Sequence, residues 1–350
     1  SGPYLDGETS ATIQKDIDPE ATAILVYTSG TTGPPKAAMI SHRNILSLLG
    51  TQSELLDFYQ DDVSFAFLPM AHVAERVLGF YGRVNNGVPA AYASSIGAVL
   101  AGLGEVKPTV FGSVPRIYEK AYAKIFSEVE KKPAAVQRIF AFATQVAREA
   151  APYRVRQEPL PLMLKLKWQA ADRLVFNKIR GAFGGRVRYS VTGAAPIAIE
   201  ILELFWGAGI PIYEVYGMTE ATVATHANRT GSVKLGTVGR VLQGLEHKIA
   251  DDGEVLIKGP WVFQGYFKNE EATASTVVDG WLHTGDIGKI DADGFLSITD
   301  RKKHLIITAG GKNLAPANIE NAIKNQSPLI SQVHAHGDKR SFVSALIAPS

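Results

Sequence analysis

The spacing of apolar residues predicts short buried strands and amphipathic helices in the first two thirds of the chain. Residues 23–27 and 64–69 are short apolar runs, which are typical of buried strands. Ser41 is a good N-cap for a helix that carries apolar residues at positions 45–49. Residues 107–116 predict a strand and a turn, and helical spacing follows from Ile117.

Two longer amphipathic helices are expected over Pro133–Ala150 and Met163–Phe183. Three prolines, Pro152, Pro159 and Pro161, are expected to separate them. From about Gly231 the pattern changes to short alternating stretches divided by turns, which predicts a small β-barrel or sandwich. A last helix near Asn318 and two strands within Val333–Ile347 complete the pattern.

Composition narrows the class of protein without identifying it. The chain has 350 residues, 46% of them hydrophobic and 20% charged, which suits a water-soluble protein of two or three domains. It contains no cysteine, which excludes disulfides and thiolate metal sites. No signal peptide or apolar run of membrane-spanning length is recognisable. Net charge is +2, but residues 116–188 hold 16 basic and 6 acidic side chains, a local charge of +10.

The stretch from Tyr27 to Lys36, Tyr-Thr-Ser-Gly-Thr-Thr-Gly-Pro-Pro-Lys, carries the strongest chemical signal. Gly30 and Gly33 allow backbone N–H groups to turn toward an anion, while Ser29, Thr31 and Thr32 add hydroxyl donors. Lys36 supplies a mobile positive charge for phosphate oxygens. The spacing is not that of a Walker A motif, because only two residues separate the glycines and Ala37 follows the lysine. A flexible polar loop is the alternative interpretation.

Three later motifs suit the rest of a nucleotide. Small residues after the strand that ends near Thr192 let a flat ring approach the backbone. Within Ile212–Glu220, Tyr216 offers a ring face for a base, and Glu220 offers the hard oxygen that Mg²⁺ prefers. Asp286 follows a glycine and suits two ribose hydroxyls, although a surface turn would also explain an aspartate there.

These motifs, in this order, resemble the adenylate-forming superfamily, whose phosphate loop reads Tyr-Thr-Ser-Gly-Thr-Thr-Gly-x-Pro-Lys-Gly. The chain departs from it only at Ala37. Residues His72–Arg76, Val114–Lys120 and the basic helical insertion resemble the long-chain fatty acyl-CoA synthetase branch. The resemblance covers nearly the whole chain and implies an α/β fold, with a mixed sheet flanked by helices, a small β-barrel and part of an α+β C-terminal domain.

The resemblance also implies roles for individual residues. Candidate catalytic residues are Lys36, His72, Thr219 and Glu220, with His72 expected at the acyl pocket as a gate rather than as a base. ATP or AMP binding is expected at Thr28, Ser29, Gly30, Thr31, Thr32, Gly33, Lys36, Gly193, Ala194, Ala195, Pro196, Glu214, Tyr216, Gly217, Met218, Thr219, Asp286 and Arg301. Mg²⁺ is expected at Thr28 and Glu220, the coenzyme A channel at Gly310, Gly311 and Lys312, and a hinge at Asp300.

The implied reaction has two steps, in which a fatty acid and ATP form acyl-AMP and coenzyme A then displaces AMP. The substrates are expected to be fatty acid, ATP and coenzyme A, with Mg²⁺ as cofactor, no nucleic acid partner and a cytoplasmic location with peripheral contact to an anionic membrane. The resemblance suggests a remnant of the first subdomain over residues 1–60, an α/β subdomain over 61–230 with its insertion at 116–188, a barrel over 231–299 and a partial mobile domain over 300–350.

Because family members carry an earlier segment and a lysine near the C-terminus, we expect this chain to be a fragment impaired in acyl-AMP formation. Two alternatives remain open. One is an adenylate-forming ligase for another acid or acceptor, and the other is a nucleotide-binding module without full activity.

Overall fold

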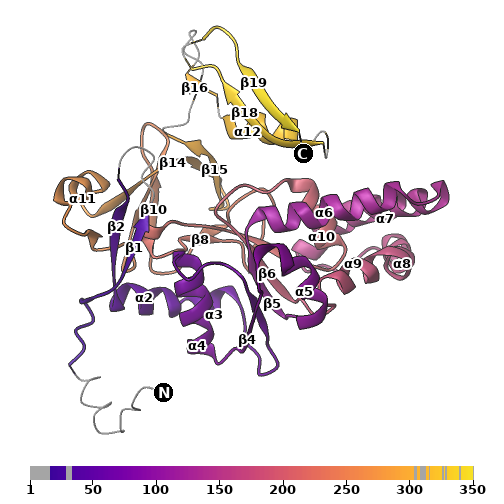
Figure 1. Cartoon of the computed structure of the whole chain (residues 1–350), viewed down its shortest axis with the longest axis horizontal. Coiled ribbons are helices and arrows are strands. Elements are labelled where there is room, and N and C mark those ends of the chain that lie inside the picture. The colour runs from indigo at the N-terminus through magenta and orange to yellow at the C-terminus, as the bar shows by residue number, and fades with distance from the viewer. Residues whose placement is uncertain are drawn as a thin grey trace.

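The computed structural model describes residues 16–28, 34–302, 306–307, 313–314, 316–324, 327, 329–338 and 340–349. Its first element is an antiparallel hairpin of β1 (Thr22–Thr28) and β2 (Lys36–Ser41), with Thr28 opposite Lys36 (Figure 1). The other edge of β2 pairs with β12 (Gly265–Tyr266). The expected phosphate loop is therefore the connection within a hairpin, although residues 29–33 lie outside the described chain.

Helix α2 (His42–Leu49) begins where the sequence predicts it. The Ser41 side chain accepts a hydrogen bond from the backbone N–H of Asn44, and the Asn44 side chain accepts one from the backbone N–H of Ser41. This reciprocal cap satisfies two N–H groups that the helix leaves without partners. The Asn44 amide also donates to the carbonyls of Pro260 and Val262, so the start of α2 is tied to a segment far along the chain.

A seven-stranded sheet forms the centre, in the order β4-β3-β5-β6-β7-β8-β9. The first five strands of this order are parallel, and β8 and β9 are antiparallel. The strands are β3 (Ser64–Ala66), β4 (Ala90–Tyr92), β5 (Val110–Ser113), β6 (Tyr189–Thr192), β7 (Ile212–Tyr216), β8 (His226–Ala227) and β9 (Arg240–Val241). Parallel strands between helices confirm the α/β class, and they bring the turns after β6 and β7 to one edge of the sheet.

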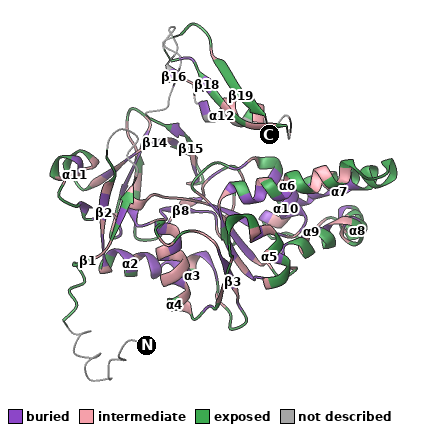
Figure 2. Cartoon of the chain, viewed as in Figure 1, coloured by how far each residue is buried: buried purple, intermediate pink, exposed green. Residues whose placement is uncertain are grey.

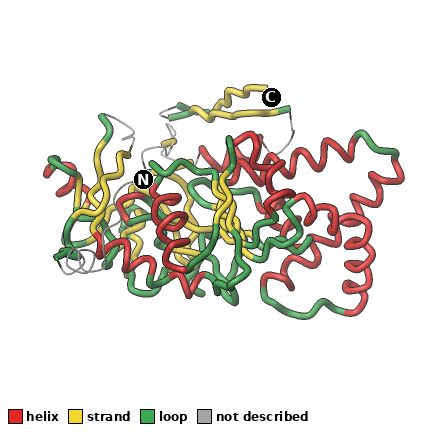
Figure 3. The backbone as a smooth tube through the Cα atoms, turned by 60° about the horizontal axis from the view of Figure 1, so that its bottom comes forward, coloured by secondary structure: helices red, strands yellow, loops and turns green. Residues whose placement is uncertain are grey.

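Helices surround this sheet, and their apolar faces supply much of the core (Figures 2 and 3). The α-helices up to residue 207 are α3 (Gln52–Leu55), α4 (Gly82–Asn86), α5 (Val99–Val106), α6 (Pro115–Glu130), α7 (Ala134–Val155), α8 (Leu162–Ala171), α9 (Asn177–Ala182) and α10 (Ile199–Gly207). Shorter 3₁₀ and π segments are η1 (Glu75–Tyr81), η2 (Ile96–Ala98), η3 (Asp172–Phe176) and η4 (Thr219–Ala221). Within the described residues, no helix is long and apolar enough to cross a membrane.

The expectation that Pro152 ends the first long helix is wrong. Helix α7 continues through Pro152 to Val155. A proline removes one backbone N–H donor from the helix, but its carbonyl can still accept, and the Pro152 carbonyl accepts a 3.1 Å hydrogen bond from the N–H of Arg156. The chain turns at Gln157, whose φ is +57°, before Pro159 and Pro161 lead into α8. In Figure 1, α7 and α8 extend away from the sheet as a protruding arm.

The region after residue 231 is antiparallel, as its alternation predicts. Strands β11 (Glu254–Lys258), β14 (Trp281–Ile290), β10 (Glu246–Ile249), β13 (Val277–Val278) and β15 (Leu296–Arg301) form a five-stranded sheet, and α11 (Glu270–Thr276) lies beside it. The expected small barrel is thus, among the described strands, an open five-stranded sheet next to the β1-β2-β12 sheet. Because β12 joins the first hairpin, residues 22–41 and 265–266 share one sheet.

The last segment contains the helix and two strands that the sequence predicts. They are α12 (Pro316–Lys324), β18 (Ile330–His336) and β19 (Ser344–Pro349), with the short pair β16 (Ile306–Ile307) and β17 (Asn313–Leu314) before them. Lys324 Nζ lies 3.1 Å from Glu119 Oε2 on α6, which connects this segment to the central part of the chain.

Candidate functional site

The turn after β6 brings two backbone segments unusually close. A Cβ atom added to Gly193 would lie 2.8 Å from the carbonyl oxygen of Val215 on β7, so only glycine fits without movement. Ala194 follows with φ of +69°, a conformation that a non-glycine residue rarely adopts. Ala194, Ala195 and Pro196 are exposed. Exposed small residues at this turn are consistent with the sequence prediction that a flat ring can approach the backbone here.

The turn after β7 is tighter still. A Cβ on Gly217 would lie 1.6 Å from the carbonyl oxygen of Val223, and both Thr222 and Val223 have positive φ, at +49° and +102°. A β-branched residue at positive φ is strained, and such strain persists only where the surroundings hold it. Here Thr222 Oγ1 donates to the Trp261 carbonyl at 2.7 Å, and Trp261 Nε1 donates to the Ala224 carbonyl at 2.9 Å.

Tyr216, Asp286 and Arg301 form one connected group. Tyr216 ends β7, and its hydroxyl donates a 2.7 Å hydrogen bond to Asp286 Oδ2 on β14. Arg301 lies opposite Asp286 in the β14–β15 ladder, and its Nε is 3.5 Å from Asp286 Oδ1. Asp286 is buried, and burial raises the pKa of its carboxyl although Tyr216 and Arg301 act in the opposite direction. The arrangement joins the two large sheets at a carboxylate held between a phenol and a guanidinium.

Neighbouring charges fix the turn that carries Asp286. The buried carboxylate of Glu254 accepts a 2.8 Å hydrogen bond from the backbone N–H of Gly285, whose φ is +71°. Lys302 Nζ lies 3.1 Å from the same carboxylate and contacts Asp252 as well. Burial opposes ionisation of Glu254, but these hydrogen bonds outweigh it and lower its pKa. Glu254 was not singled out from the sequence, because a Gly-Glu pair in a β turn carries no distinguishing pattern.

A second group links the hairpin to the turn after β7. Tyr266 on β12 donates from its hydroxyl to Glu220 Oε1 at 2.7 Å, and Lys36 Nζ lies 5.2 Å from the centre of the Tyr266 ring. Glu220 is buried, and its backbone carbonyl accepts a 2.8 Å hydrogen bond from the N–H of Phe263. Lys36, predicted to bind phosphate oxygens, and Glu220, predicted to bind Mg²⁺, therefore both contact one tyrosine. The sequence reasoning missed this tyrosine, since Gly265-Tyr266 gave only a β-strand signal.

Glu214 occupies a different setting from the other predicted residues. It lies in the middle of β7, is buried, and accepts a 3.0 Å hydrogen bond at Oε2 from the N–H of Gly236. Burial raises the pKa of Glu214 to about 8, and the single hydrogen bond from Gly236 lowers it only in part. The carboxyl thus holds the loop between β8 and β9. Its contact with a nucleotide stays a prediction.

The other predicted residues within the described chain have the following positions. His72 is exposed in the turn before η1, where its Nδ1 accepts a 3.2 Å hydrogen bond from the N–H of Ala74. Thr28 is half-buried, and its hydroxyl lies 3.4 Å from the Lys36 carbonyl. Met218 and Thr219 lie in the turn beside Glu220, and Asp300 is buried in β15. Gly310, Gly311 and Lys312 lie outside the described residues, as do Ser29, Gly30, Thr31, Thr32 and Gly33.

The residues around Glu220 have the chemistry that Mg²⁺ uses. Among the described residues no cluster of three or more His, Cys, Asp or Glu could hold a metal by itself. Mg²⁺ commonly takes only one or two protein carboxylates and completes its shell with water and phosphate oxygens. Tyr266 is hydrogen-bonded to Oε1 of Glu220, and no described residue donates to Oε2. A buried carboxylate with one oxygen left open fits that type of binding.

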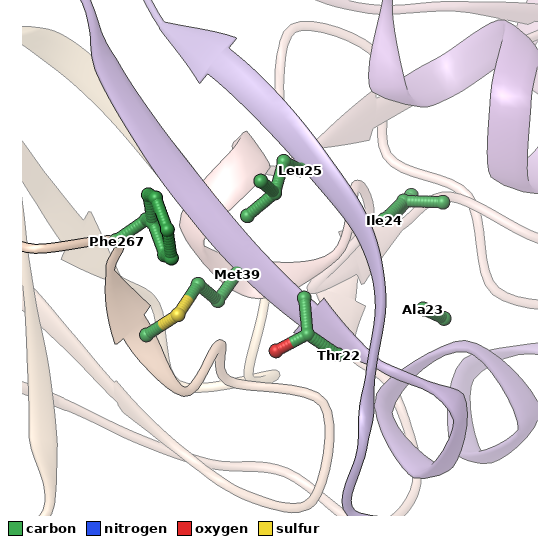
Figure 4. Close-up of a pocket in the computed structure, with 6 residues that line it drawn as sticks. All are labelled: Thr22, Ala23, Ile24, Leu25, Met39 and Phe267. Carbon is green, nitrogen blue, oxygen red and sulfur yellow. The ribbon is translucent and has the colours of Figure 1, made fainter. Parts of the chain in front are cut away.

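A shallow apolar hollow on the hairpin sheet lies apart from these groups. Figure 4 shows its lining, which comprises Thr22, Ala23, Ile24, Leu25, Met39 and Phe267. It contains none of the predicted site residues. Its apolar side chains belong to β1, β2 and the residue after β12, and it offers no charged group to a phosphate.

Comparison with known proteins decides the family. Residues 4–267 match the profile of the AMP-binding enzyme family, and residues 303–350 match that of the AMP-binding enzyme C-terminal domain. The chain belongs to the AMP-binding enzyme family. The predicted adenylate-forming resemblance is thereby confirmed, and the two matches leave residues 268–302 between them.

Curated relatives of this AMP-binding enzyme are named as ligases of fatty acids. The chain is 41% identical over 350 residues to a putative fatty-acid–CoA ligase, fadD11, of Mycobacterium tuberculosis, covering 99% of this chain and 61% of the relative. It is 41% identical over 330 residues to the long-chain-fatty-acid–CoA ligase FadD15 of Mycobacterium bovis, covering 93% of this chain and 54% of the relative. The chain therefore spans between half and two thirds of the length of these relatives.

Solved structures share the fold. MatB from Rhodopseudomonas palustris with bound ATP superposes with a TM-score of 0.71 at 25% identity, covering 96% of this chain and 59% of the other. O-succinylbenzoate coenzyme A synthetase from Bacillus subtilis, with ATP and a magnesium ion, superposes with a TM-score of 0.69 at 25% identity, covering 95% and 61%. These matches confirm the predicted mixed α/β architecture.

Proposed function

We propose that this chain is the nucleotide-binding part of an AMP-forming fatty acid–CoA ligase. The observation that carries the proposal is the Tyr216–Asp286–Arg301 group, in which a carboxylate for ribose hydroxyls is hydrogen-bonded to a ring suited to the base. The turn of small residues after β6 lies beside it in the parallel sheet and supplies the facing wall. A base between this wall and Tyr216 would direct its phosphates toward Glu220 and Lys36.

In the first step, a carboxylate oxygen of the acid attacks the α-phosphorus of ATP, and the bond from that phosphorus to the bridging oxygen of pyrophosphate breaks. Lys36 would hold the β- and γ-phosphates, and the Thr219 hydroxyl would donate to an α-phosphate oxygen. Glu220, with Thr28, would hold Mg²⁺, which offsets negative charge on the phosphates when bound. The protein then acts mainly by positioning the two reactants and by stabilising charge.

In the second step, the thiol sulfur of coenzyme A attacks the acyl carbon of acyl-AMP and loses its proton. The bond from the acyl carbon to the phosphate oxygen breaks, and AMP leaves with that oxygen and the electron pair. We propose that residues 310–312 line the channel for coenzyme A and that the chain pivots near Asp300 between the steps. The domain boundaries at residues 60, 230 and 299 belong to the same proposal. An adenylate-forming ligase for another acid or acceptor is the competing function.

The fatty acid is favoured by the relatives, since fadD11 and FadD15 are both named for fatty acids. Each methylene of a buried acyl chain contributes about 0.8 kcal/mol, so affinity should rise with chain length. In the full-length protein, thioester formation from palmitate, octanoate, acetate and benzoate should be compared. A preference for acetate or benzoate would reject the fatty acid, while nucleotide binding could still stand.

Ribose binding by Asp286 gives the direct test. Asp286→Ala should weaken ATP binding, measured by calorimetry, because hydroxyls that lose a partner cost about 1–3 kcal/mol. Asp293→Ala is the matched control, since Asp293 is an exposed aspartate in the turn between the same two strands. Equal affinity of wild type and Asp286→Ala for ATP would remove Asp286 from the site.

We also propose that the protruding arm of α7 and α8 contacts an anionic membrane. Leu162, Met163 and Leu166 are 73%, 69% and 53% exposed at the start of α8, with Lys165 and Lys167 exposed between and beside them. Exposed apolar side chains among basic ones suit an interface where both lipid tails and anionic headgroups are present. A structural pair of helices with a solvated charged face is the alternative.

Vesicle sedimentation distinguishes these possibilities. Vesicles that contain the anionic lipid phosphatidylglycerol should retain the protein at low salt and release it at high salt. A Lys165→Gln/Lys167→Gln double variant should bind less, whereas Lys258→Gln/Lys289→Gln, two exposed lysines elsewhere, should bind as wild type. Sedimentation that ignores acidic lipid and salt would leave the arm with a structural role only.

A further inference from the structure

The hydroxyl of Tyr266 reaches the buried carboxylate of Glu220 from a strand that lies 46 residues further along the chain. The register of the hairpin sheet explains the contact. Tyr266 pairs with Ala38 on β2, and Lys36 is two residues before Ala38 on the same face. Ala38 is fully buried and carries only a methyl group, so the Lys36 side chain can lie across the tyrosine ring.

We propose that Tyr266 is a positioning residue that holds Glu220 and Lys36 in place for Mg·ATP. This inference rests on the proposed function. The hydroxyl donates to Oε1 of Glu220, no described residue donates to Oε2, and the lysine ammonium lies 5.2 Å from the centre of the tyrosine ring. Tyr266 thus fixes the position of Glu220, the proposed Mg²⁺ ligand, relative to Lys36, the proposed ligand of the terminal phosphates.

The surroundings of Tyr266 keep it rigid. Its ring packs edge-on against Phe263 at 4.9 Å between centres, and its backbone N–H donates to Thr273 Oγ1 on α11 at 2.9 Å. The Phe263 N–H in turn donates to the backbone carbonyl of Glu220. Residues 263–266 therefore contact Glu220 twice, once at its side chain through the Tyr266 hydroxyl and once at its backbone carbonyl through the Phe263 N–H. Gly265 permits this path, because its φ is +132° and a Cβ there would lie 2.6 Å from Thr273.

The phenol is the donor in this contact, because an ionised carboxylate oxygen can only accept. A hydrogen bond from a group behind a metal ligand orients that ligand, and loss of such a group typically weakens metal binding by about 10- to 100-fold.

The test separates metal binding from nucleotide binding in the full-length protein. Tyr266→Phe removes the hydroxyl and keeps the ring over Lys36. We expect it to raise the Mg²⁺ concentration needed for half-maximal ATP binding by about tenfold. Mn²⁺ bound in the presence of ATP, counted by electron paramagnetic resonance, should weaken by a similar factor. Binding of AMP without metal should stay within about twofold of wild type.

Tyr118→Phe is the matched control, because Tyr118 is a fully buried tyrosine whose hydroxyl donates to the Val191 carbonyl away from Glu220. It should change neither metal nor nucleotide binding. Tyr266→Leu also removes the ring, and it should further weaken ATP relative to AMP through the displaced Lys36.

Each outcome decides something different. Selective loss of metal-dependent binding in Tyr266→Phe supports the inference. Unchanged Mg²⁺ and Mn²⁺ dependence overturns it and leaves the proposed function standing. Equal weakening of AMP and Mg·ATP, with a lowered thermal midpoint, assigns Tyr266 a purely structural role. If wild type binds neither AMP nor ATP, the proposed function fails, and the inference fails with it.

Discussion

The backbone N–H of Gly236 donates a 3.0 Å hydrogen bond to Oε2 of Glu214, a carboxyl group that is buried in the central sheet. This is the one polar partner of that side chain among the described residues. Because burial dominates, the pKa of Glu214 is raised to about 8. Glu214 is therefore mostly protonated at neutral pH, when an exposed glutamate is ionised.

The contribution of Glu214 to the free energy of unfolding should fall as pH rises from about 4.5 to about 8. In this window the unfolded chain has released the proton and the folded chain retains it, which gives a slope of about 1.4 kcal/mol per pH unit. Glu214→Gln keeps the acceptor for Gly236 and removes the titration. Urea unfolding at pH 5.5, 7 and 8.5 should show a flatter dependence than wild type, and Glu246→Gln, at an exposed position, should not.

The contact of buried His226 with half-buried His247 predicts an opposite dependence in acid. His226 Nε2 lies 2.8 Å from His247 Nδ1, and burial lowers the pKa of His226 to about 3. Between pH 6.5 and about 3, His226 is protonated in the unfolded chain but stays neutral in the folded chain. The free energy of unfolding therefore decreases as pH falls through this window. His226→Gln should reduce the acid slope even if it lowers stability overall. The exposed His336→Gln should keep the wild-type slope, and an equal slope in both variants would contradict the role of His226.

The sequence predicted the elements that carry local signals. The strand at 22–28, the cap at Ser41 and the turns after Thr192 and Tyr216 follow from runs of apolar residues, a capping side chain and glycines, which all act within a few residues. The family resemblance then ordered Tyr216, Asp286 and Arg301 as one site. Their hydrogen bond and ion pair agree with that grouping, while each contact with a nucleotide stays a prediction.

The pattern of apolar and polar residues could not predict which strands pair when they lie far apart in the sequence. The return of β12 to β2 places Tyr266 beside Lys36, and nothing within residues 260–270 indicates which strand they join. The burial of Glu214 was likewise hidden, since a charged residue in a β-run reads as facing solvent. The prediction from Pro152 was wrong, because a proline removes one donor without always ending a helix, and α7 continues past it to Val155.

Glycine at position 217 should be required by space rather than by flexibility. Gly217→Ala would place a methyl group 1.6 Å from the Val223 carbonyl oxygen, so the strained turn that contains Glu220 would have to move. We expect a loss of about 1–3 kcal/mol or more in stability, with weaker ATP binding. In the control Gly181→Ala, the new methyl lies in open space on helix α9, and stability should rise by about 0.4–1 kcal/mol. Similar effects of the two substitutions in chemical denaturation would refute the steric argument.

The ion pair between Glu119 and Lys324 predicts how firmly the C-terminal segment is held in this arrangement. The two atoms are 3.1 Å apart, and the side chains are 30% and 33% exposed, so solvent screens the attraction only in part. A double-mutant cycle with Glu119→Gln and Lys324→Gln should give a coupling energy of about 0.5–1 kcal/mol that shrinks at high salt.

If the segment pivots near Asp300 as proposed, this contact must break in the other orientation. Either single variant should then shift the ratio of the two half-reactions, measured as pyrophosphate release and as thioester formation from synthetic acyl-AMP. The nearby pair Lys131–Glu128, which lies within one part of the chain, serves as the control, and its loss should change neither rate. A coupling energy near zero would mean that the ion pair contributes nothing to docking, and the pivot would have to be held by other contacts.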